Sequence, residues 1–96
     1  MTVIWSDRAA SDVERIRAYL FERNPLAAIA VSASIIAAAE GLVILPRRYA
    51  QREGGFREML VSRYHYVIRY ELAADPRNPK RQIVHILSVW HPAQDR

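Results

Sequence analysis

The sequence predicts an α+β fold, with a helical hairpin packed on one face of a mostly antiparallel four-stranded sheet in the order β-α-α-β-β-β. Two strand-like runs, Phe56–Val61 and Tyr64–Leu72, are joined by the short polar connection Ser62-Arg63. A third run, Gln82–Trp90, would complete an antiparallel meander. One short apolar strand and two segments with helical patterns precede these runs. The length suits one core, so we expect residues 1–96 to form a single domain.

The composition allows a core without covalent or metal support. Half of the residues, 51%, are hydrophobic, and there is no cysteine, which excludes disulfides and thiolate metal sites. The three histidines lack the spacing of metal ligands. No phosphate-binding glycine loop is present, and we expect neither a metal nor a cofactor. Because no basic leader precedes Val3-Ile4-Trp5, we expect no signal peptide and a cytoplasmic protein.

The basic charge is concentrated in the second half of the chain. The net charge is +4, with a balance of −1 in residues 1–45 and +5 in residues 46–96. Arginine supplies nearly all of the cations, and its planar fork suits phosphate and carboxylate groups. A genome that prefers arginine codons accounts for the ratio of arginine to lysine. The clustering in one half instead indicates an anionic partner.

The first 25 residues predict a strand followed by an amphipathic helix. Thr2–Trp5 is the strand, and Ser6 is the expected N-cap of the helix. The apolar face of the helix carries Ala9, Val13, Ile16 and Leu20. Charged residues such as Asp12 fall away from this face, and we expect them to be solvated. Asn24-Pro25 ends this helix and begins the next one.

The second helical segment is unusually apolar. From Leu26 to Leu45, sixteen of twenty residues are apolar and Glu40 is the one charge. The length suits a membrane span, but the many alanines and Glu40-Gly41 argue against one. We expect a buried helix with one side on the sheet and another on the first helix. Any apolar strip left over then needs cover from a partner protein. Pro46 is expected to stop the helix.

The sheet half begins with a polar connection and continues with alternating strands. The connection brings Arg47, Arg48 and Arg52 to the edge of the sheet. In the run that follows, one face is apolar and consists of Tyr66, Ile68, Tyr70 and Leu72. The opposite face consists of His65, Val67, Arg69 and Glu71. Asp75–Lys80 predicts an exposed hairpin tip. The last strand is apolar on both faces, which suggests either a central strand or one that a partner covers.

Two arginines and one histidine are the candidate reactive groups. Arg57 and Arg69 lie in neighbouring strands at positions that could share a face and bind a phosphate. They can equally pair with Glu58, with Glu71 or with the carboxylates of a partner. His91 follows Trp90 at the end of the last strand, where it is either an acid or base or a cap on the sheet. His85, inside an apolar strand, is expected to be packed and hydrogen-bonded.

Six short motifs resemble the RelE/ParE superfamily of bacterial type II toxins, and they span nearly the whole chain. The first helix, Ser6–Leu20, is similar to that of the ParE branch. The other five, in order, are Asn24-Pro25-x-Ala27-Ala28, Leu45-Pro46, Gly55-x-Arg57-Glu58-Met59-Leu60-Val61, Tyr66-Val67-Ile68-x-Tyr70 and Ile86-Leu87-x-Val89-x-His91-x-Ala93-Gln94-Asp95. None is specific alone, but their order makes the resemblance strong.

The resemblance implies a small cytoplasmic toxin with a role in plasmid stabilisation, held inactive by a cognate antitoxin encoded beside it. Antitoxins of this superfamily lay a helix or an extended tail over the toxin. Such a partner would cover the apolar second helix and meet the basic half of the chain. No membrane contact is implied, and DNA would be contacted only through the antitoxin.

The two branches of the superfamily imply different chemistry. RelE-type members cut mRNA on the ribosome, and their third strand carries an arginine where this chain has Val67. Their tyrosine near the C-terminus is also unmatched, since Pro92 follows His91. ParE-type members poison DNA gyrase, and the Val67 difference favours this branch.

The alternatives assign different roles to the same side chains. In a RelE-like nuclease, Arg57, Arg69 and His91 would form a substitute catalytic set. In a ParE-like toxin there is no catalytic set, and the side chains that bind the antitoxin or target are Arg47, Arg48, Arg52, Arg57, Arg69, Trp90 and His91. A third alternative is a degraded toxin that only binds its antitoxin.

Overall fold

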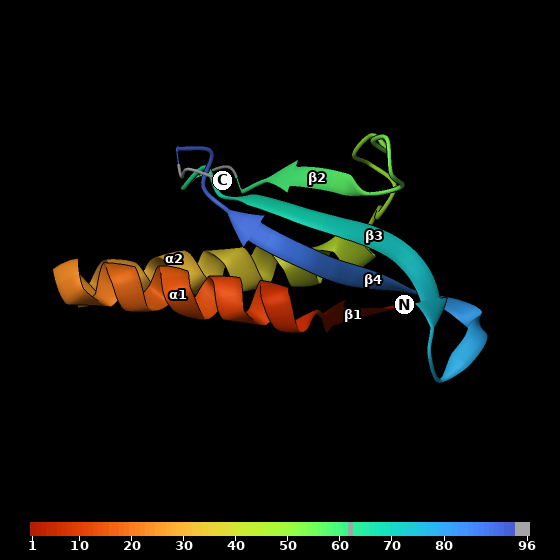
Figure 1. Ribbon diagram of the computed structural model, residues 1–96, viewed down its shortest axis with the longest axis horizontal. Coiled ribbons are helices and arrows are strands. Elements are labelled where there is room, and N and C mark those ends of the chain that lie inside the picture. Colours follow the sequence, from red (N-terminus) through yellow and green to blue (C-terminus); the bar gives the residue numbers. More distant parts are fainter. Residues whose placement is uncertain (62, 94–96) are drawn as a thin grey trace.

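Two helices lie against one face of a four-stranded sheet in the computed structural model, which describes residues 1–61 and 63–93 (Figure 1). Strand β1 (Thr2–Trp5) leads into α1 (Asp7–Arg23) and α2 (Pro25–Glu40), and a 3-10 turn (Gly41–Val43) follows α2. The chain continues through β2 (Arg57–Leu60), β3 (Val67–Asp75) and β4 (Asn78–Trp90). The predicted α+β fold and order of elements are confirmed.

The sheet is mixed, with β4 inside it. The strand order is β1-β4-β3-β2, in which β1 runs parallel to β4 and the other two pairs are antiparallel. The central position predicted for the last strand is therefore confirmed. The β3–β4 hairpin extends past the helical layer, as Figure 1 shows.

The two helices begin at the predicted caps. Ser6 Oγ accepts a hydrogen bond from the Ala9 backbone N–H at 3.0 Å and donates one to the Leu87 carbonyl at 3.0 Å. Ser6 therefore begins α1 and also ties it to β4. Asn24 Oδ1 accepts from the Ala27 N–H at 3.1 Å, and Pro25 occupies the first turn of α2. A single residue, Asn24, separates the two helices.

The core lies between the helices and the sheet. The largest fully buried side chains are Tyr70, Ile35, Ile68, Ile86 and Val84, which come from α2, β3 and β4. The predicted apolar face of α1 is confirmed, since its first three members are buried and the fourth packs against the core.

Asp12 departs from the prediction that it is solvated. Its side chain is only 5% exposed, and Oδ2 accepts a hydrogen bond from the Val89 backbone N–H at 2.9 Å. Oδ1 pairs with Arg15 on the solvent side. The helix periodicity placed Asp12 beside the apolar stripe, but it could not reveal that β4 presents an N–H group there.

The strand boundaries in the β2–β4 region also differ from the prediction. The run predicted to start at Tyr64 starts at Val67, because the chain turns between Val61 and Tyr66. The Val61 N–H donates to the Tyr66 carbonyl at 2.7 Å, and His65 has a left-handed φ of 63°. The expected two-residue connection is therefore too short.

The β3–β4 tip is exposed, as predicted, but shorter. The strands pair as far as Asp75 and Asn78, which leaves Pro76 and Arg77 as the turn. Asp75 Oδ1 accepts a hydrogen bond from the Arg77 N–H at 2.9 Å, which is an Asx turn.

The second helix is shorter and less buried than predicted. It becomes a 3-10 turn at Gly41, and Leu45, the residue before Pro46, has a left-handed φ of 56°. Residues Pro25–Val43 have the length and the mean hydropathy, 2.0, of a membrane span, and one third of them are buried. The buried residues are Ala28, Val31, Ser32, Ile35 and Ala39 in α2 and Leu42 in the 3-10 turn. This side packs on α1 and the core as expected, and the remainder is open.

Candidate functional site

On the sheet face that points away from the helices, an arginine is enclosed by a carboxylate and two aromatic rings. Arg69 Nη2 donates to Glu58 Oε2 at 3.0 Å, since the register places these residues opposite each other. Its guanidinium carbon lies 4.1 Å from the centre of the Phe56 ring and 5.0 Å from that of the Trp90 ring. The predicted alternative of pairing with Glu58 is confirmed. Arg69 and Trp90, two of the predicted binding residues, are thus in contact.

Arg57 lies on the opposite face of the sheet, so the prediction that it could share a face with Arg69 is wrong. It pairs with Tyr70 across the β2–β3 ladder, and Tyr70 points into the core. Arg57 Nη1 donates to the Tyr49 carbonyl at 2.5 Å and approaches the Arg47 carbonyl at 3.5 Å. The side chain therefore holds the connection between α2 and β2. Strand alternation alone could not set the relative register that separates the two arginines.

Tyr70 fixes the same connection from inside the core. Its side chain is fully buried, and Oη donates to the Pro46 carbonyl at 2.7 Å. Burial raises the pKa of the Tyr70 phenol, and the neighbouring Arg57 charge opposes that rise. The neutral phenol is thus favoured, which keeps its proton available for the hydrogen bond.

His91 lies at the end of β4 against an aromatic ring. Its ring meets that of Tyr66 edge-on, with the centres 5.1 Å apart, and its Nδ1 accepts the Ala93 N–H at 3.0 Å. In a neutral imidazole this bond leaves the proton on Nε2, so that Nε2 is a donor. Burial raises the pKa of the Tyr66 phenol, and Tyr66 is also neutral near pH 7. To act as a base through Nδ1, His91 would first have to give up its hydrogen bond with the Ala93 N–H.

The three arginines of the α2–β2 connection reach the sheet by different routes. Arg47 Nη2 donates to Gln82 Oε1 of β4 at 2.8 Å. Arg52 Nε lies 3.7 Å from Glu58 Oε1, on the same carboxylate that Arg69 binds. Arg48 is exposed on the connection. Arg52 lies at the edge strand β2, as predicted, whereas Arg47 contacts the inner strand β4. The arginines of the connection do not converge on one point with Arg57 and Arg69.

The remaining histidines, His65 and His85, lie in different parts of the fold. His85 Nδ1 lies 2.9 Å from Glu71 Oε2, which confirms the prediction of a packed, hydrogen-bonded residue. His65 is exposed in the β2–β3 turn. Within residues 1–61 and 63–93, no group of three or more metal-binding side chains lies together.

The outer side of α2 is an apolar stripe that the fold leaves open. Leu26, Ile29 and Ile36 are 79%, 60% and 45% exposed. The complete stripe, which we call the α2 stripe, consists of Leu26, Ile29, Ala30, Ala33, Ile36 and Ala37. These positions recur at helical spacing and form one face. The sequence indicated an apolar excess in this helix, but only the packing shows which residues form it.

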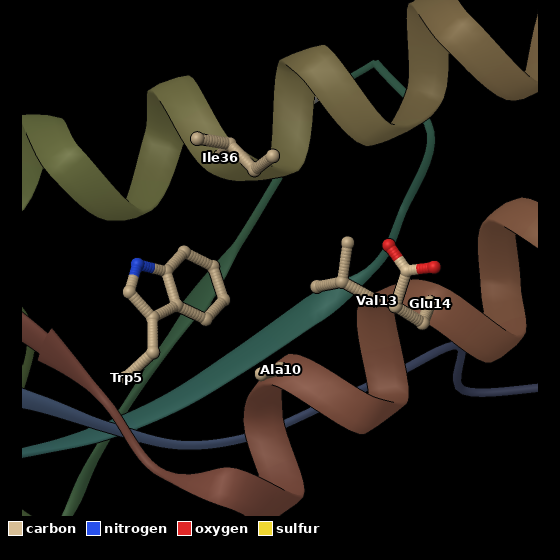
Figure 2. Close-up of a pocket in the computed structure, with 5 residues that line it drawn as sticks. All are labelled: Trp5, Ala10, Val13, Glu14 and Ile36. Carbon is tan, nitrogen blue, oxygen red and sulfur yellow. The ribbon is translucent and has the colours of Figure 1, made fainter.

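A cleft of about 250 Å³ lies beside the α2 stripe, between α1, α2 and the end of β1 (Figure 2). Its walls include Trp5, Val13 and Ile36, which come from three different elements. Glu14 lies at the rim in Figure 2, and Trp5 Nε1 donates to Glu40 Oε2 at 3.2 Å. The sequence indicated Trp5 as a strand residue and contained no signal for its place in this cleft.

Comparison with known proteins identifies the family. The model of the family described as the ParE toxin of the type II toxin-antitoxin system parDE matches residues 3–96. The chain belongs to the ParE toxin family.

Relatives of this ParE-family chain match over its full length. Toxin RelE2 of Caulobacter vibrioides is 34% identical over 92 residues, which cover 96% of each chain. Toxin RelE1 of the same organism is 32% identical, and the match covers 99% of this chain and 97% of the relative. A structure titled as a chromosomal ParDE TA system from P. aeruginosa has a similar fold, with a TM-score of 0.77, 19% identity and 95% coverage of both chains.

These findings confirm the resemblance to RelE/ParE toxins. The chain is the toxin of a type II toxin–antitoxin module, and such a module implies a cognate antitoxin as partner. Gln94 and Asp95 of the last motif lie outside the described residues. This ParE-family toxin thus has an exposed apolar stripe on α2 and two arginines, Arg57 and Arg69, on opposite faces of its sheet.

Proposed function

We propose that this ParE-family toxin arrests growth in the cytoplasm by binding and poisoning DNA gyrase, and that it has no nuclease activity of its own. The observation that carries the proposal is that Arg57 and Arg69 lie on opposite faces of the sheet. Each already has partners within the chain: Arg57 binds backbone carbonyls, and Arg69 binds Glu58. Both side chains then serve the fold and protein contacts.

The chemistry of RNA cleavage explains why this separation matters. Attack of a 2′-hydroxyl on its neighbouring phosphate needs a base, an acid for the leaving oxygen and cations for the charge that develops on phosphorus. These groups must surround one phosphate at hydrogen-bond distance. Arginines on two faces of a sheet cannot both reach that phosphate, and Nδ1 of His91 already accepts a backbone N–H.

We propose further that the cognate antitoxin covers the α2 stripe. Three large side chains exposed on one helix face form an apolar surface that a stable partner normally buries. The cleft beside Trp5 adds a place for one inserted side chain. The basic half of the chain, which includes Arg47, Arg48 and Arg52, supports an acidic segment in the same partner.

The experiment that tests the proposed target is induction of the toxin alone in bacteria, with RNA 5′ ends mapped across the transcriptome and a DNA-damage reporter measured in parallel. We expect growth arrest and reporter induction without new RNA ends. Purified toxin should also trap cleaved DNA in a reaction with gyrase. RNA cuts in codon register on translated messages would contradict the proposal. An absence of growth arrest would indicate the degraded toxin that only binds its antitoxin.

A ribosome-dependent mRNA endonuclease is the second candidate. Two observations favour it: the full-length relatives carry the name RelE, and His91 lies against Tyr66 near the end of the sheet. His91→Asn should then abolish both RNA cutting and toxicity. His65→Asn is a matched control, because His65 is exposed and its left-handed backbone suits asparagine. Arg57→Ala is a poorer test, since the loss of its carbonyl contacts would disturb the connection.

A further inference from the structure

A small hollow, lined mainly by apolar residues, lies at the end of α2. Its volume is about 160 Å³. Its lining includes Ala37 and Gly41 at the helix end, Leu45, Arg48 and Tyr49 in the connection, and Met59 in β2. We call it the Leu45 hollow. A space of roughly 150 Å³ accommodates one benzene ring, so the hollow is large enough for one aliphatic or aromatic side chain.

The outer wall of the Leu45 hollow is exposed and strained. Ile44 and Leu45 are 74% and 68% exposed. Leu45 has a φ of 56°, a conformation that costs a side chain of this kind roughly 1–2 kcal/mol. Because the Leu45 side chain stays exposed, it contributes little to the stability of the fold. Its strained backbone is therefore better explained by a role in binding a partner.

The wall is also held in place before any partner binds. The Arg48 N–H donates to the Leu45 carbonyl at 3.0 Å, and Tyr70 Oη donates to the Pro46 carbonyl at 2.7 Å. Arg57 Nη1 holds the Tyr49 carbonyl at 2.5 Å. Three bonds therefore fix the four residues that follow the strained position. A preformed site loses less conformational entropy on binding, so the strain is compatible with high affinity.

The charge at the rim selects the ligand. Arg48 lines the hollow, and its guanidinium carbon lies 5.5 Å from the centre of the Tyr49 ring. None of the lining residues in the described part of the chain is a carboxylate. Arg47, its neighbour, is directed to Gln82 of β4. A partner side chain that enters the hollow would therefore place its neighbouring residue beside the exposed Arg48, whose guanidinium can pair with a carboxylate.

We propose that the Leu45 hollow is an anchor site of the antitoxin, which inserts one apolar side chain and pairs an adjacent carboxylate with Arg48. This inference rests on the proposed cover of the α2 stripe by the antitoxin. Ala37 belongs to both the stripe and the hollow, so one segment can occupy them continuously. The exposed apolar side chains Ile44 and Leu45 favour the permanent partner over the target, because long-lived interfaces bury more apolar surface than transient ones.

The test measures the dissociation constant of the full-length toxin and the purified product of the neighbouring antitoxin gene. Leu45→Asn keeps the left-handed backbone and removes the apolar wall. Gly41→Leu fills the hollow from inside, since a Cβ at Gly41 meets no atom within 4 Å and its φ of −69° suits any residue. We expect each to weaken binding about 30-fold, the size of a hot-spot loss. The Tm of Leu45→Asn should equal or exceed that of the wild type.

Arg48→Gln should weaken binding about 3- to 10-fold, the range for a partly exposed ion pair. Arg77→Gln, at the exposed hairpin tip, is the matched control and should bind as the wild type does.

Wild-type affinity of both Leu45→Asn and Gly41→Leu would overturn the proposal. Unchanged antitoxin affinity together with lost growth arrest would also overturn it, and would assign the hollow to the toxin's target. If the wild-type toxin causes no growth arrest, the proposed function fails, yet the dissociation constants still decide whether the hollow binds the antitoxin.

Discussion

At the residue scale, one buried carboxylate connects the helical layer to the sheet. Asp12 accepts the backbone N–H of Val89, and the exposed Arg15 pairs with its other oxygen. The hydrogen bond is buried, whereas the ion pair is open to solvent on the arginine side. The buried hydrogen bond should therefore contribute more to stability than the exposed ion pair, although both involve the Asp12 side chain.

Asp12→Ala should lower the free energy of unfolding by about 2 kcal/mol, because it leaves the Val89 N–H buried without an acceptor. Arg15→Ala, the control, should cost less than about 1 kcal/mol, since its side chain is 71% exposed. Urea unfolding followed by circular dichroism measures both. Equal losses in the two variants would show that the ion pair, and not the buried bond, carries the stability.

The raised pKa of Tyr70 predicts that the free energy of unfolding decreases at alkaline pH. Its phenol has a raised pKa in the folded state, so its contribution to stability is complete below the unfolded pKa of about 10. That contribution is lost as the pH rises through the folded pKa. Tyr70→Phe should cost about 1 kcal/mol at pH 8, because the Pro46 carbonyl loses its donor.

The gap in unfolding free energy between the wild type and Tyr70→Phe should therefore narrow above pH 10. Tyr19→Phe, at an exposed tyrosine, is the control and should lower the free energy of unfolding by less than Tyr70→Phe does at pH 8. Unfolding curves at pH 8, 9, 10 and 10.5 supply the comparison. A Tyr70→Phe gap that is constant over this range would mean that the buried phenol does not control the alkaline loss.

At the scale of elements, α2 has two unlike sides. The inner side, with Val31, Ile35 and Ala39, belongs to the core, and the outer side is the α2 stripe. Substitutions on the outer side should leave the fold intact, because those side chains bury little area within the chain. The inner face of α2 thus serves the stability of the fold, and the outer face is available for binding.

Ile29→Gln and Ile36→Gln should each weaken antitoxin binding about 10-fold while changing the Tm by no more than a few degrees. Phe21→Gln is the control, because Phe21 is 53% exposed on α1, outside the α2 stripe. Isothermal titration calorimetry with the antitoxin measures the affinity. If Phe21→Gln weakens binding as much as the two stripe variants, the antitoxin covers the helical layer broadly and the α2 stripe has no special role.

At the scale of the whole molecule, charge and apolar surface occupy different regions. The helical half has a balance of −1 and carries the α2 stripe, whereas the half from residue 46 onward has a balance of +5. An antitoxin that meets both would use an apolar segment on the helices and an acidic one on the sheet half. The apolar contact on the helices then sets the lifetime of the complex, and the acidic contact on the sheet half sets the association rate.

Raising the salt concentration from about 0.05 M to 0.5 M should slow antitoxin association roughly tenfold and change dissociation little, because salt screens the long-range attraction. Arg47→Gln with Arg48→Gln should reduce this salt dependence. Stopped-flow fluorescence of the intrinsic tryptophans measures the association rate. An association rate that is independent of salt would remove the acidic segment from the proposal.

Local patterns in the sequence determined a large part of this architecture. Ser6 and Asn24 marked the helix starts, the period of the apolar residues marked one face of α1, and the last strand was apolar on both faces because it lies inside the sheet. These signals are local, since a cap or a period needs only a few neighbouring residues. The family resemblance, carried by six motifs in order, likewise needed no coordinates.

Only the tertiary structure decided which side chains meet across the fold. The register of β2 on β3 separates Arg57 from Arg69, the turn at His65 moves the start of β3, and β4 brings Val89 to Asp12. Packing also decides which part of the apolar helix becomes the α2 stripe, and it creates the Leu45 hollow where the stretch from Ala37 to Tyr49 meets Met59 of β2. These outcomes depend on the pairing of residues far apart in the chain, and a one-residue change of register would exchange the faces of a strand. A local pattern contains no information about that pairing.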